Sequence, residues 1–297
     1  MSAFATFLVL LSAVLHVTWN SLAKTSGSPV VFMGVKGGFL LLLACLLLPW
    51  MPLQGVPSAA WPFIVGSGLV HALYAVSLAR AYELGDISFV YPIARSAPAF
   101  VPGFAWFLLG ERLTVLGVVG TVLVVGAISL LQLREGAQSL RDIGRSLSRP
   151  DGRWALVTLG CVVAFSLLDK AGMGAMSTSS GIAPATRGLV YFLLENSIAY
   201  TIYLIVLGLQ RLPVLRATFR RQWRSGLVAA LMTMVSYSLI LHVMQSQPLS
   251  YIVVVRQSGV VLAVLYGWLF LREPQGPLRL GLSGVIACGV ALVVASG

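Results

Sequence analysis

Four positively charged side chains lie inside long apolar stretches of the sequence. They are Lys36, Arg95, Arg187 and Arg256. A charged side chain in hydrocarbon costs at least about 2.5 kcal/mol, so such residues normally face a polar cavity or a partner. Arginine holds a carboxylate or a phosphate through two parallel hydrogen bonds, whereas lysine acts as a point charge. The four cations therefore predict a binding site for a small molecule that carries a carboxylate, phosphonate or phosphate group.

A structural role is the alternative for each cation, because a long side chain can reach the polar surface of the membrane or pair with a buried carboxylate. For Arg95 and Arg256 we favour the cavity, since polar and helix-loosening residues stand near them, and these are tolerated where a helix lines a cavity. The neighbours are Pro92, Ser96, Pro98, Gln257 and Ser258.

Asp169 and Glu195 are the carboxylates that we place inside apolar stretches. A carboxylate that takes up and releases a proton at such a position would couple transport to the proton gradient. A salt bridge to Lys170, to Arg187 or to another buried cation explains them equally well. Both carboxylates are therefore candidates for proton coupling, with a structural ion pair as the alternative.

Aromatic and polar residues in the same stretches are candidates for the walls of a pocket. They are Trp19, Asn20, Tyr74, Tyr91, Tyr191 and Tyr237. Each aromatic residue is explained as well by packing or by a place in the membrane interface. The histidines fall one to a stretch and lack metal-ligand spacing, so helix packing is their default role. We expect no catalytic residue, no metal and no cofactor.

The elements that position these residues are membrane-spanning helices. Hydrophobic residues make up 58% of the 297 positions and charged residues 10%, against about 25% charged in soluble domains. A spanning helix needs about 20 mostly apolar residues. Such stretches recur at 3–22, 30–50, 61–82, 87–109, 113–133, 154–174, 183–209, 224–246, 248–270 and 276–296. The sequence predicts an all-α integral membrane protein of ten transmembrane helices.

An internal repeat divides these helices into two groups of five. Ser88, Ser96, Trp106, Leu109 and Glu111 recur 162 positions later as Ser250, Ser258, Trp268, Leu271 and Glu273. An odd number of helices in each copy gives the copies opposite orientations in the membrane, as in many secondary transporters. We predict a first five-helix repeat at 1–133, a charged linker at 134–153 and a second five-helix repeat at 154–297.

The basic residues indicate how the chain crosses the membrane. The formal net charge is +11, but the charges stand between apolar runs, which argues against nucleic acid as a partner. Most of the 20 lysines and arginines fall in the loops of one face. The positive-inside rule places that face in the cytoplasm and both termini in the periplasm, for a protein of the inner membrane.

A short motif invites an enzymatic interpretation that the repeat weakens. Gly281 to Gly284 read GLSG, the bare GxSG form of intramembrane serine proteases. The first copy has Gly117 and Gly120 at the matching positions, with valine in place of the serine. We therefore interpret these glycines as sites of close helix packing, and an intramembrane enzyme is a distant alternative.

Three segments resemble the EamA-type ten-helix members of the drug/metabolite transporter superfamily. They are LHVTWNSLAK at 15–24, LARAYELGDISFVYPIARSAPAFVPGFAWFLLGERLT at 78–114 and SLILHVMQSQPLSYIVVVRQSGVVLAVLYGWLFLREP at 238–274. The resemblance implies an inverted-repeat carrier of metabolites with a central cavity. The family's motif glutamate then corresponds to Glu111 and Glu273, which we interpret as structural residues paired locally with Arg112 and Arg272. The second half departs from the family pattern at 253–257, so equal roles for Arg95 and Arg256 do not follow.

Together these patterns predict a secondary transporter that moves a small anionic metabolite by alternating access. The partners expected are this metabolite and the lipid bilayer, with a homodimer as one arrangement of the chain. A neutral amino-acid or amine exporter of the same fold is the nearest alternative. A non-transporting membrane partner or an intramembrane enzyme is the alternative from another class.

Overall fold

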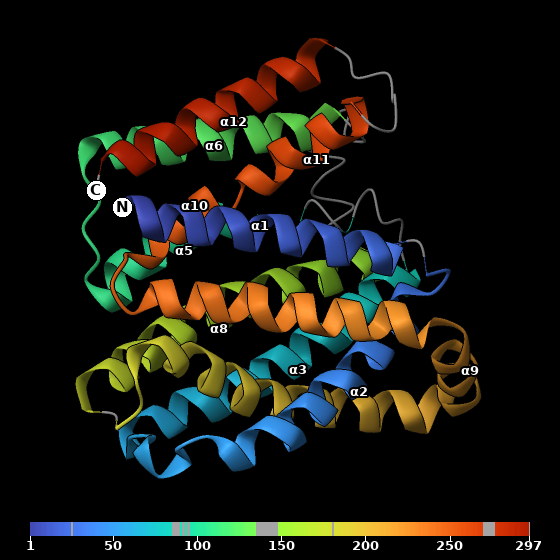
Figure 1. Cartoon of the computed structure of the whole chain (residues 1–297). Helices are drawn as coiled ribbons and strands as arrows, with labels where there is room; N and C mark the ends of the chain where they lie inside the picture. Colours follow the sequence, from blue (N-terminus) through green and yellow to red (C-terminus); the bar gives the residue numbers. More distant parts are fainter. Residues whose placement is uncertain are drawn as a thin grey trace. The chain divides into compact units, whose positions relative to one another are not determined.

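The computed structural model describes residues 1–24, 26–84, 90, 93, 96–134, 148–179, 181–269 and 277–296. Over these residues the secondary structure is helical throughout, without strands (Figure 1). The long helices are α1 (Ala3–Lys24), α2 (Pro29–Leu47), α3 (Trp61–Leu84), α6 (Val115–Arg134), α8 (Pro150–Ser179), α9 (Pro184–Met244) and α12 (Pro277–Ala295). The shorter ones are α5 (Ala97–Leu109), α10 (Leu249–Val255) and α11 (Ser258–Leu269), with 3-10 turns at Leu48–Trp50, Leu53–Gly55 and Ser58–Ala60.

The helices have the length and composition of membrane-spanning segments. Five described helical stretches are long and apolar enough to cross a bilayer, and they begin at Ala3, Pro29, Ser58, Pro150 and Pro184. The shorter apolar helices, such as α5 and the described part of α12, add to these. The prediction of an all-α, multi-pass membrane protein is confirmed at this level.

Helix α9 joins two of the predicted spans, 183–209 and 224–246, into one element of 61 residues. At 1.5 Å per residue a straight helix of this length would extend roughly 90 Å, three times the hydrocarbon thickness. The helix instead folds back at two kinks, where Arg211 and Gln222 have non-helical backbone angles (Figure 1). Pro213 explains the first kink, because its ring clashes with the preceding turn and it lacks an N–H donor.

Two other predicted boundaries need correction. The span at 248–270 is interrupted at Arg256 and Gln257, where the backbone bonds tighten to the i→i+3 pattern between α10 and α11. Helix α8 begins at Pro150, so the end of the predicted linker at 134–153 is already helical. Most of the predicted helix start at 87–95 lies outside the described residues.

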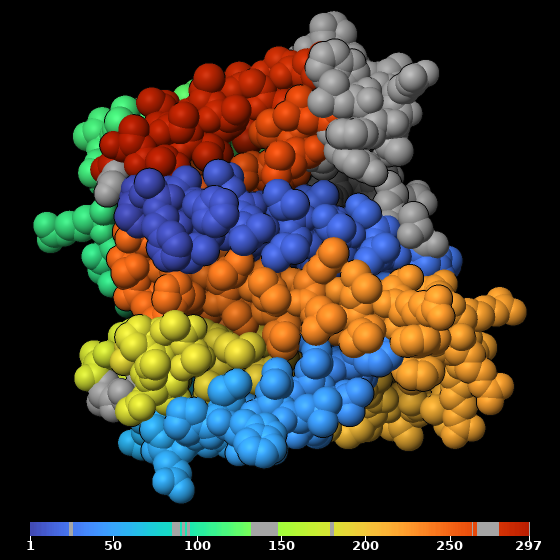
Figure 2. All heavy atoms as spheres, in the orientation of Figure 1, coloured from blue at the N-terminus to red at the C-terminus, as the bar shows by residue number. Residues whose placement is uncertain are grey.

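The chain forms two compact units. Unit 1 comprises residues 1–14, 77–163 and 247–297, and unit 2 comprises residues 15–76 and 164–246. In unit 1, α6 and α12 lie side by side (Figure 1). In unit 2, α2 packs against α9, and Figure 2 shows their atoms in contact on the face in view. The predicted domains at 1–133 and 154–297 stay predictions.

The helices α6 and α12 come close together at Gly120 and Gly289, and not at the glycines of the GLSG motif, 281–284. A Cβ added at Gly120 would lie 2.6 Å from the carbonyl oxygen of Gly289, and one added at Gly289 would lie 2.7 Å from that of Gly120. In the described part of the chain, an added Cβ at Gly281 or Gly284 meets nothing within 4 Å. The close packing expected for Gly281 and Gly284 is therefore wrong, and Gly289 has that role.

We expect Gly120→Ala to lower the free energy of unfolding by about 1–3 kcal/mol relative to Gly126→Ala. The added methyl group forces α6 away from the Gly289 carbonyl, whereas Gly126 on the same helix has open space at its Cβ. Thermal unfolding of the purified protein in detergent measures the difference. Equal stabilities of the two variants would contradict the contact between the glycines.

Candidate functional site

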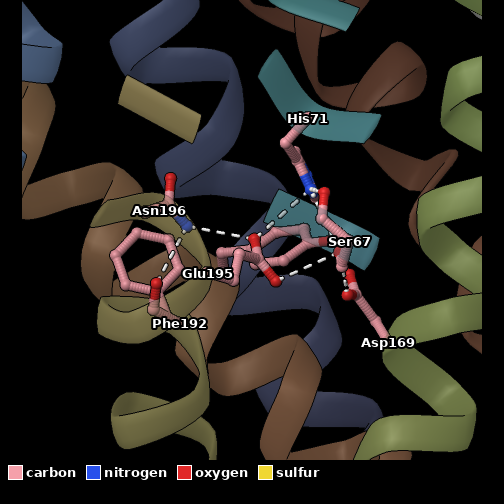
Figure 3. A network of polar contacts seen from close by, with 7 residues as sticks. Ser67, His71, Asp169, Phe192, Glu195 and Asn196 are labelled. Atoms are coloured by element: carbon pink, nitrogen blue, oxygen red, sulfur yellow. Dashed lines mark hydrogen bonds and ion pairs between the residues drawn. The ribbon is translucent and has the colours of Figure 1, made fainter. Parts of the chain in front are cut away.

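A buried cluster of polar side chains lies inside unit 2, contributed by α3, α8 and α9 (Figure 3). Its centre is the hydroxyl of Ser67, which donates a hydrogen bond of 2.5 Å to Asp169 Oδ1. The same oxygen lies 3.4 Å from Glu195 Oε2 and 3.3 Å from His71 Nδ1. Ser67, Asp169 and Glu195 are fully buried. A single serine therefore links two carboxylates that have no access to solvent.

Further donors complete the cluster. Tyr237 donates a hydrogen bond of 2.5 Å to Asp169 Oδ2, and Asn196 Nδ2 donates one of 3.0 Å to Glu195 Oε1. Within the described residues, neither carboxylate forms an ion pair with a lysine or an arginine. The predicted alternative, a salt bridge to Lys170 or Arg187, is replaced by these contacts.

Helical spacing explains why these side chains meet. Ser67, His71 and Tyr74 stand four and three residues apart on α3, which places them on one face of the helix. The close approach of α3 to α9 depends on Gly68, because an added Cβ there would lie 2.9 Å from the Glu195 carbonyl oxygen. Gly172 gives room to the ring of Tyr191 in the same way.

His71 is held in a fixed orientation. Its ring stacks on Phe165 with centroids 3.8 Å apart, and Tyr74 and Tyr237 meet it edge-on. The Nδ1 atom lies 3.2 Å from the Ser67 carbonyl oxygen and 3.4 Å from Glu195 Oε1. Because a carbonyl oxygen only accepts, this contact requires a proton on Nδ1.

A metal is one group that such a cluster could hold. Ligand atoms of His71, Asp169 and Glu195 lie within 4.8 Å of one another, whereas the sequence analysis expected a packing role for His71. The Ser67 hydroxyl already bridges the same groups, so an ion would have to displace it. The geometry therefore fits a hydrogen-bond network better than it fits a metal centre.

The count of hydrogen-bond donors and acceptors indicates that the two carboxylates share one proton. The Ser67 hydroxyl has a single hydrogen, which it donates to the nearer oxygen, that of Asp169. A hydrogen bond between Ser67 and Glu195 then needs a proton on Glu195. The row Glu195, Ser67, Asp169 can therefore pass one proton from carboxylate to carboxylate. Tyr191, buried on α9, has a hydroxyl that makes no hydrogen bond within the described residues.

Lys36 forms a second buried feature of unit 2. The side chain is 1% exposed, and Nζ lies 3.9 Å from the centroid of the Trp19 ring and 5.4 Å from that of Tyr200. Gly37 beside it makes room for the Tyr200 ring, because an added Cβ would overlap that ring. In the described ranges no carboxylate lies within 4 Å of the ammonium. The buried charge is thus held by ring faces rather than by a counterion.

The other predicted site residues lie elsewhere. Arg187 stands at the start of α9, where Nε donates to the Ile182 carbonyl oxygen and Nη1 to Gln245. Asn20 donates to the His16 carbonyl oxygen of its own helix. Arg256 is half-buried at the break between α10 and α11 in unit 1. Arg95 and Tyr91 lie outside the described residues.

Glu111 is a structural residue, as predicted, but its partner differs. Its carboxylate accepts hydrogen bonds of 2.6 and 3.0 Å from the backbone N–H groups of Leu249 and Ser250, and one of 2.7 Å from the Ser250 hydroxyl. It therefore caps the start of α10 within unit 1, where unpaired N–H groups favour an anion. The predicted pairing with Arg112 is not among the ion pairs of the described residues.

We expect Glu111→Gln to lower the free energy of unfolding by about 1–3 kcal/mol, because charge-assisted bonds to two backbone donors weaken. Thermal unfolding in detergent measures the loss. Arg112→Gln is the matched control, since it removes the partner that the sequence suggested and leaves the cap intact. A loss as large in the control as in Glu111→Gln would restore the local ion pair.

Sequence reasoning missed Ser67, His71 and Asn196. The signal for the first two was the spacing of Ser67, His71 and Tyr74 on one helical face. The Ser283 hydroxyl of the GLSG motif is buried and makes no hydrogen bond within the described residues.

Long apolar helices around buried charged side chains define a multi-pass membrane protein with a polar interior. Residues 3–133 match the EamA-like transporter family, which is part of the drug/metabolite transporter superfamily. This match covers a little under half of the chain, and it agrees with the resemblance seen in the sequence. A search of curated proteins gives no match.

One solved crystal structure of a protein is similar over the whole chain. It covers 100% of this chain and 98% of its own, with a TM-score of 0.72 and 14% sequence identity. At this identity the likeness shows a shared fold alone.

Proposed function

We propose that the chain is a secondary transporter in which ten spans form two inverted five-helix repeats and expose a central site to each side of the inner membrane in turn. The repeat in the sequence and the odd number of helices in each copy support this arrangement. Its substrate is a small metabolite that carries a carboxylate, phosphonate or phosphate group.

The observation that carries the substrate class is the environment of Lys36. An ammonium group that is 1% exposed, in a membrane protein, without a carboxylate within 4 Å among the described residues is unstable unless a partner compensates it. The rings of Trp19 and Tyr200 supply part of this compensation. The anionic group of the substrate supplies the rest. Arg95 and Arg256 stay predicted substrate-binding residues.

The second part of the proposal is coupling to protons. Asp169 and Glu195 hold one proton through Ser67, and they release it when the site faces the other side of the membrane. Such buried, hydrogen-bonded carboxylates are typical of proton relays in transporters. Because Lys36 binds the anion and the carboxylates bind the proton, the two tasks are carried by separate side chains of unit 2.

Counterflow in proteoliposomes tests the substrate class. Vesicles loaded with an unlabelled carboxylate, phosphonate or phosphate metabolite should accumulate the same labelled compound, with no uptake in protein-free vesicles. Uptake of amines or neutral metabolites alone would overturn the proposal. A reporter fused to the C-terminus tests the topology, and a cytoplasmic signal would contradict the predicted orientation.

A neutral amino-acid or amine substrate is the second candidate, and the polar cluster favours it. The carboxylates of Asp169 and Glu195 lie beside the ring of His71, which stacks on that of Phe165, and aromatic faces together with carboxylates suit an ammonium group. Competition by a carboxylate and by an amine of equal size distinguishes the two. Stronger competition by the amine would support this second candidate. The homodimer stays a prediction.

A further inference from the structure

A groove of about 260 Å³ lies on unit 2 between α2 and the segment that joins the two legs of α9. Its floor and walls include Gly38, Leu204 and Leu215, and its rim carries Arg216 and Arg220. The volume is smaller than the roughly 300–1,000 Å³ of pockets that enclose a drug-sized ligand. A ligand here is therefore held only in part.

The position of the groove relative to the membrane follows from the legs of α9. Each leg, residues 184–210 and 223–244, is long enough to cross the hydrocarbon core, which needs about 20 residues. The joining segment, residues 211–222, therefore lies at the membrane surface. Exposed apolar residues and exposed arginines are mixed along it, including Leu212, Phe219 and Arg220. This composition is typical of segments that lie in the interface.

Contacts within unit 2 hold this segment in place. The ring of Phe219 stacks on that of Phe39 of α2 with centroids 5.5 Å apart. At the second kink, Gln222 Nε2 donates a hydrogen bond of 2.9 Å to the Ser26 carbonyl oxygen. The groove is thus bounded by two elements that contact each other directly.

The rim of the groove carries the positive charges of two arginines, and no acidic side chain of the described residues pairs with them. Arg216 and Arg220 stand one helical turn apart and are exposed, and in the described part of the chain no carboxylate lies within 4 Å of either. Two neighbouring guanidinium groups suit a phosphate, which accepts paired hydrogen bonds from each. Below them, Gly38 leaves apolar space, because an added Cβ there meets nothing within 4 Å.

We propose that this groove binds an anionic phospholipid, with the headgroup phosphate between Arg216 and Arg220 and the start of an acyl chain over Gly38 and Leu204. A soluble phosphate compound would use the arginines alone, whereas an acyl chain also fills the apolar part of the groove at Gly38 and Leu204. A lipid fits both halves of the groove. The site is distinct from Lys36 and from the carboxylate cluster, so it does not depend on the proposed substrate.

Native mass spectrometry and thermal unfolding of the full-length protein in detergent test the proposal. The probes are phosphatidylglycerol, phosphatidylcholine and soluble glycerophosphate. Phosphatidylglycerol should be retained and should raise the Tm, because it binds the folded state. Arg216→Gln combined with Arg220→Gln should weaken this binding roughly 30-fold, as expected from two interfacial arginines. Gly38→Leu fills the floor and should reduce lipid retention with the arginines in place.

The matched control combines Arg221→Gln with Arg224→Gln, which removes the same charge from the same region outside the groove. Retained binding in this control, with loss in both groove variants, supports the site. An equal loss in the control would mean a diffuse attraction of the basic surface and would overturn the proposal. An equal rise in Tm with glycerophosphate, or unchanged retention in Gly38→Leu, would overturn the lipid assignment.

Discussion

Transport of the anionic substrate should fall by at least about 30-fold when Lys36 is replaced by methionine. Methionine has a similar length and no charge, so it removes the ammonium group over the Trp19 ring and leaves the packing largely intact. The fold should be retained or even stabilised, because the replacement takes an unpaired charge out of the interior. Counterflow and thermal unfolding, measured on the same preparation, separate the two effects.

Arg187→Gln is the control for Lys36. Arg187 is a cation that the sequence placed in the membrane, but its hydrogen bonds to Ile182 and Gln245 brace the start of α9. The variant should lose stability and keep its apparent affinity for substrate. If Lys36→Met transports as well as the unmodified protein, the anion site is not at Lys36. If Arg187→Gln loses affinity instead, the anion is held at the start of α9.

The second large effect is expected for Asp169→Asn. An amide cannot take up or release the proton that Asp169 shares with Glu195 through Ser67. Accumulation driven by a pH gradient should fall at least about 30-fold, as is typical when a charge in a buried pair is lost. Counterflow at equal pH on both sides should persist, because it needs substrate exchange without net proton movement.

Two further variants decide the route of the proton. Glu195→Gln should reproduce the selective loss, and Ser67→Ala should do so if the hydroxyl connects the carboxylates. Thr158→Ala removes a buried hydroxyl of unit 1 that contacts Ser77 and serves as the control. Equal loss of counterflow and of gradient-driven uptake in Asp169→Asn would indicate a structural or substrate-binding role and would remove the coupling proposal.

Much of the helical architecture could be predicted from the sequence. The apolar stretches at 3–22 and 61–82 correspond closely to α1 and α3, because lipid requires every backbone group to be paired within a helix. The continuity of α9 was missed, since arginines and Pro213 usually end a span. Pro213 accounts for the first kink alone, whereas the helical joining segment after it is also held by contacts with α2 and with Ser26, which lie far away in the sequence.

The candidate site was predicted only in part. Charge alone identified Lys36, Asp169 and Glu195, because charged residues are rare in apolar stretches. The partners could not be derived, since the meeting of Ser67 with both carboxylates depends on the rotation of three helices about their axes. The close approach of α3 to α9 at Gly68 also depends on how these helices are rotated about their axes. Arg187 is a charged residue that this rule placed in the membrane interior, but its position depends on where α9 begins, and it lies at the start of that helix.

The 61-residue α9 also bears on how the chain is assembled during synthesis. Ser67, His71 and Asp169 precede Glu195 in the sequence and Asn196 follows it directly, so most hydrogen-bonding partners of Glu195 have been synthesised by the time its leg is complete. Tyr237 arrives last, on the returning leg, and completes the ligands of Asp169. The residues of the polar cluster are therefore synthesised in the order of the sequence, and Asp169 has its full set of hydrogen-bonding partners only after the returning leg of α9 has been made.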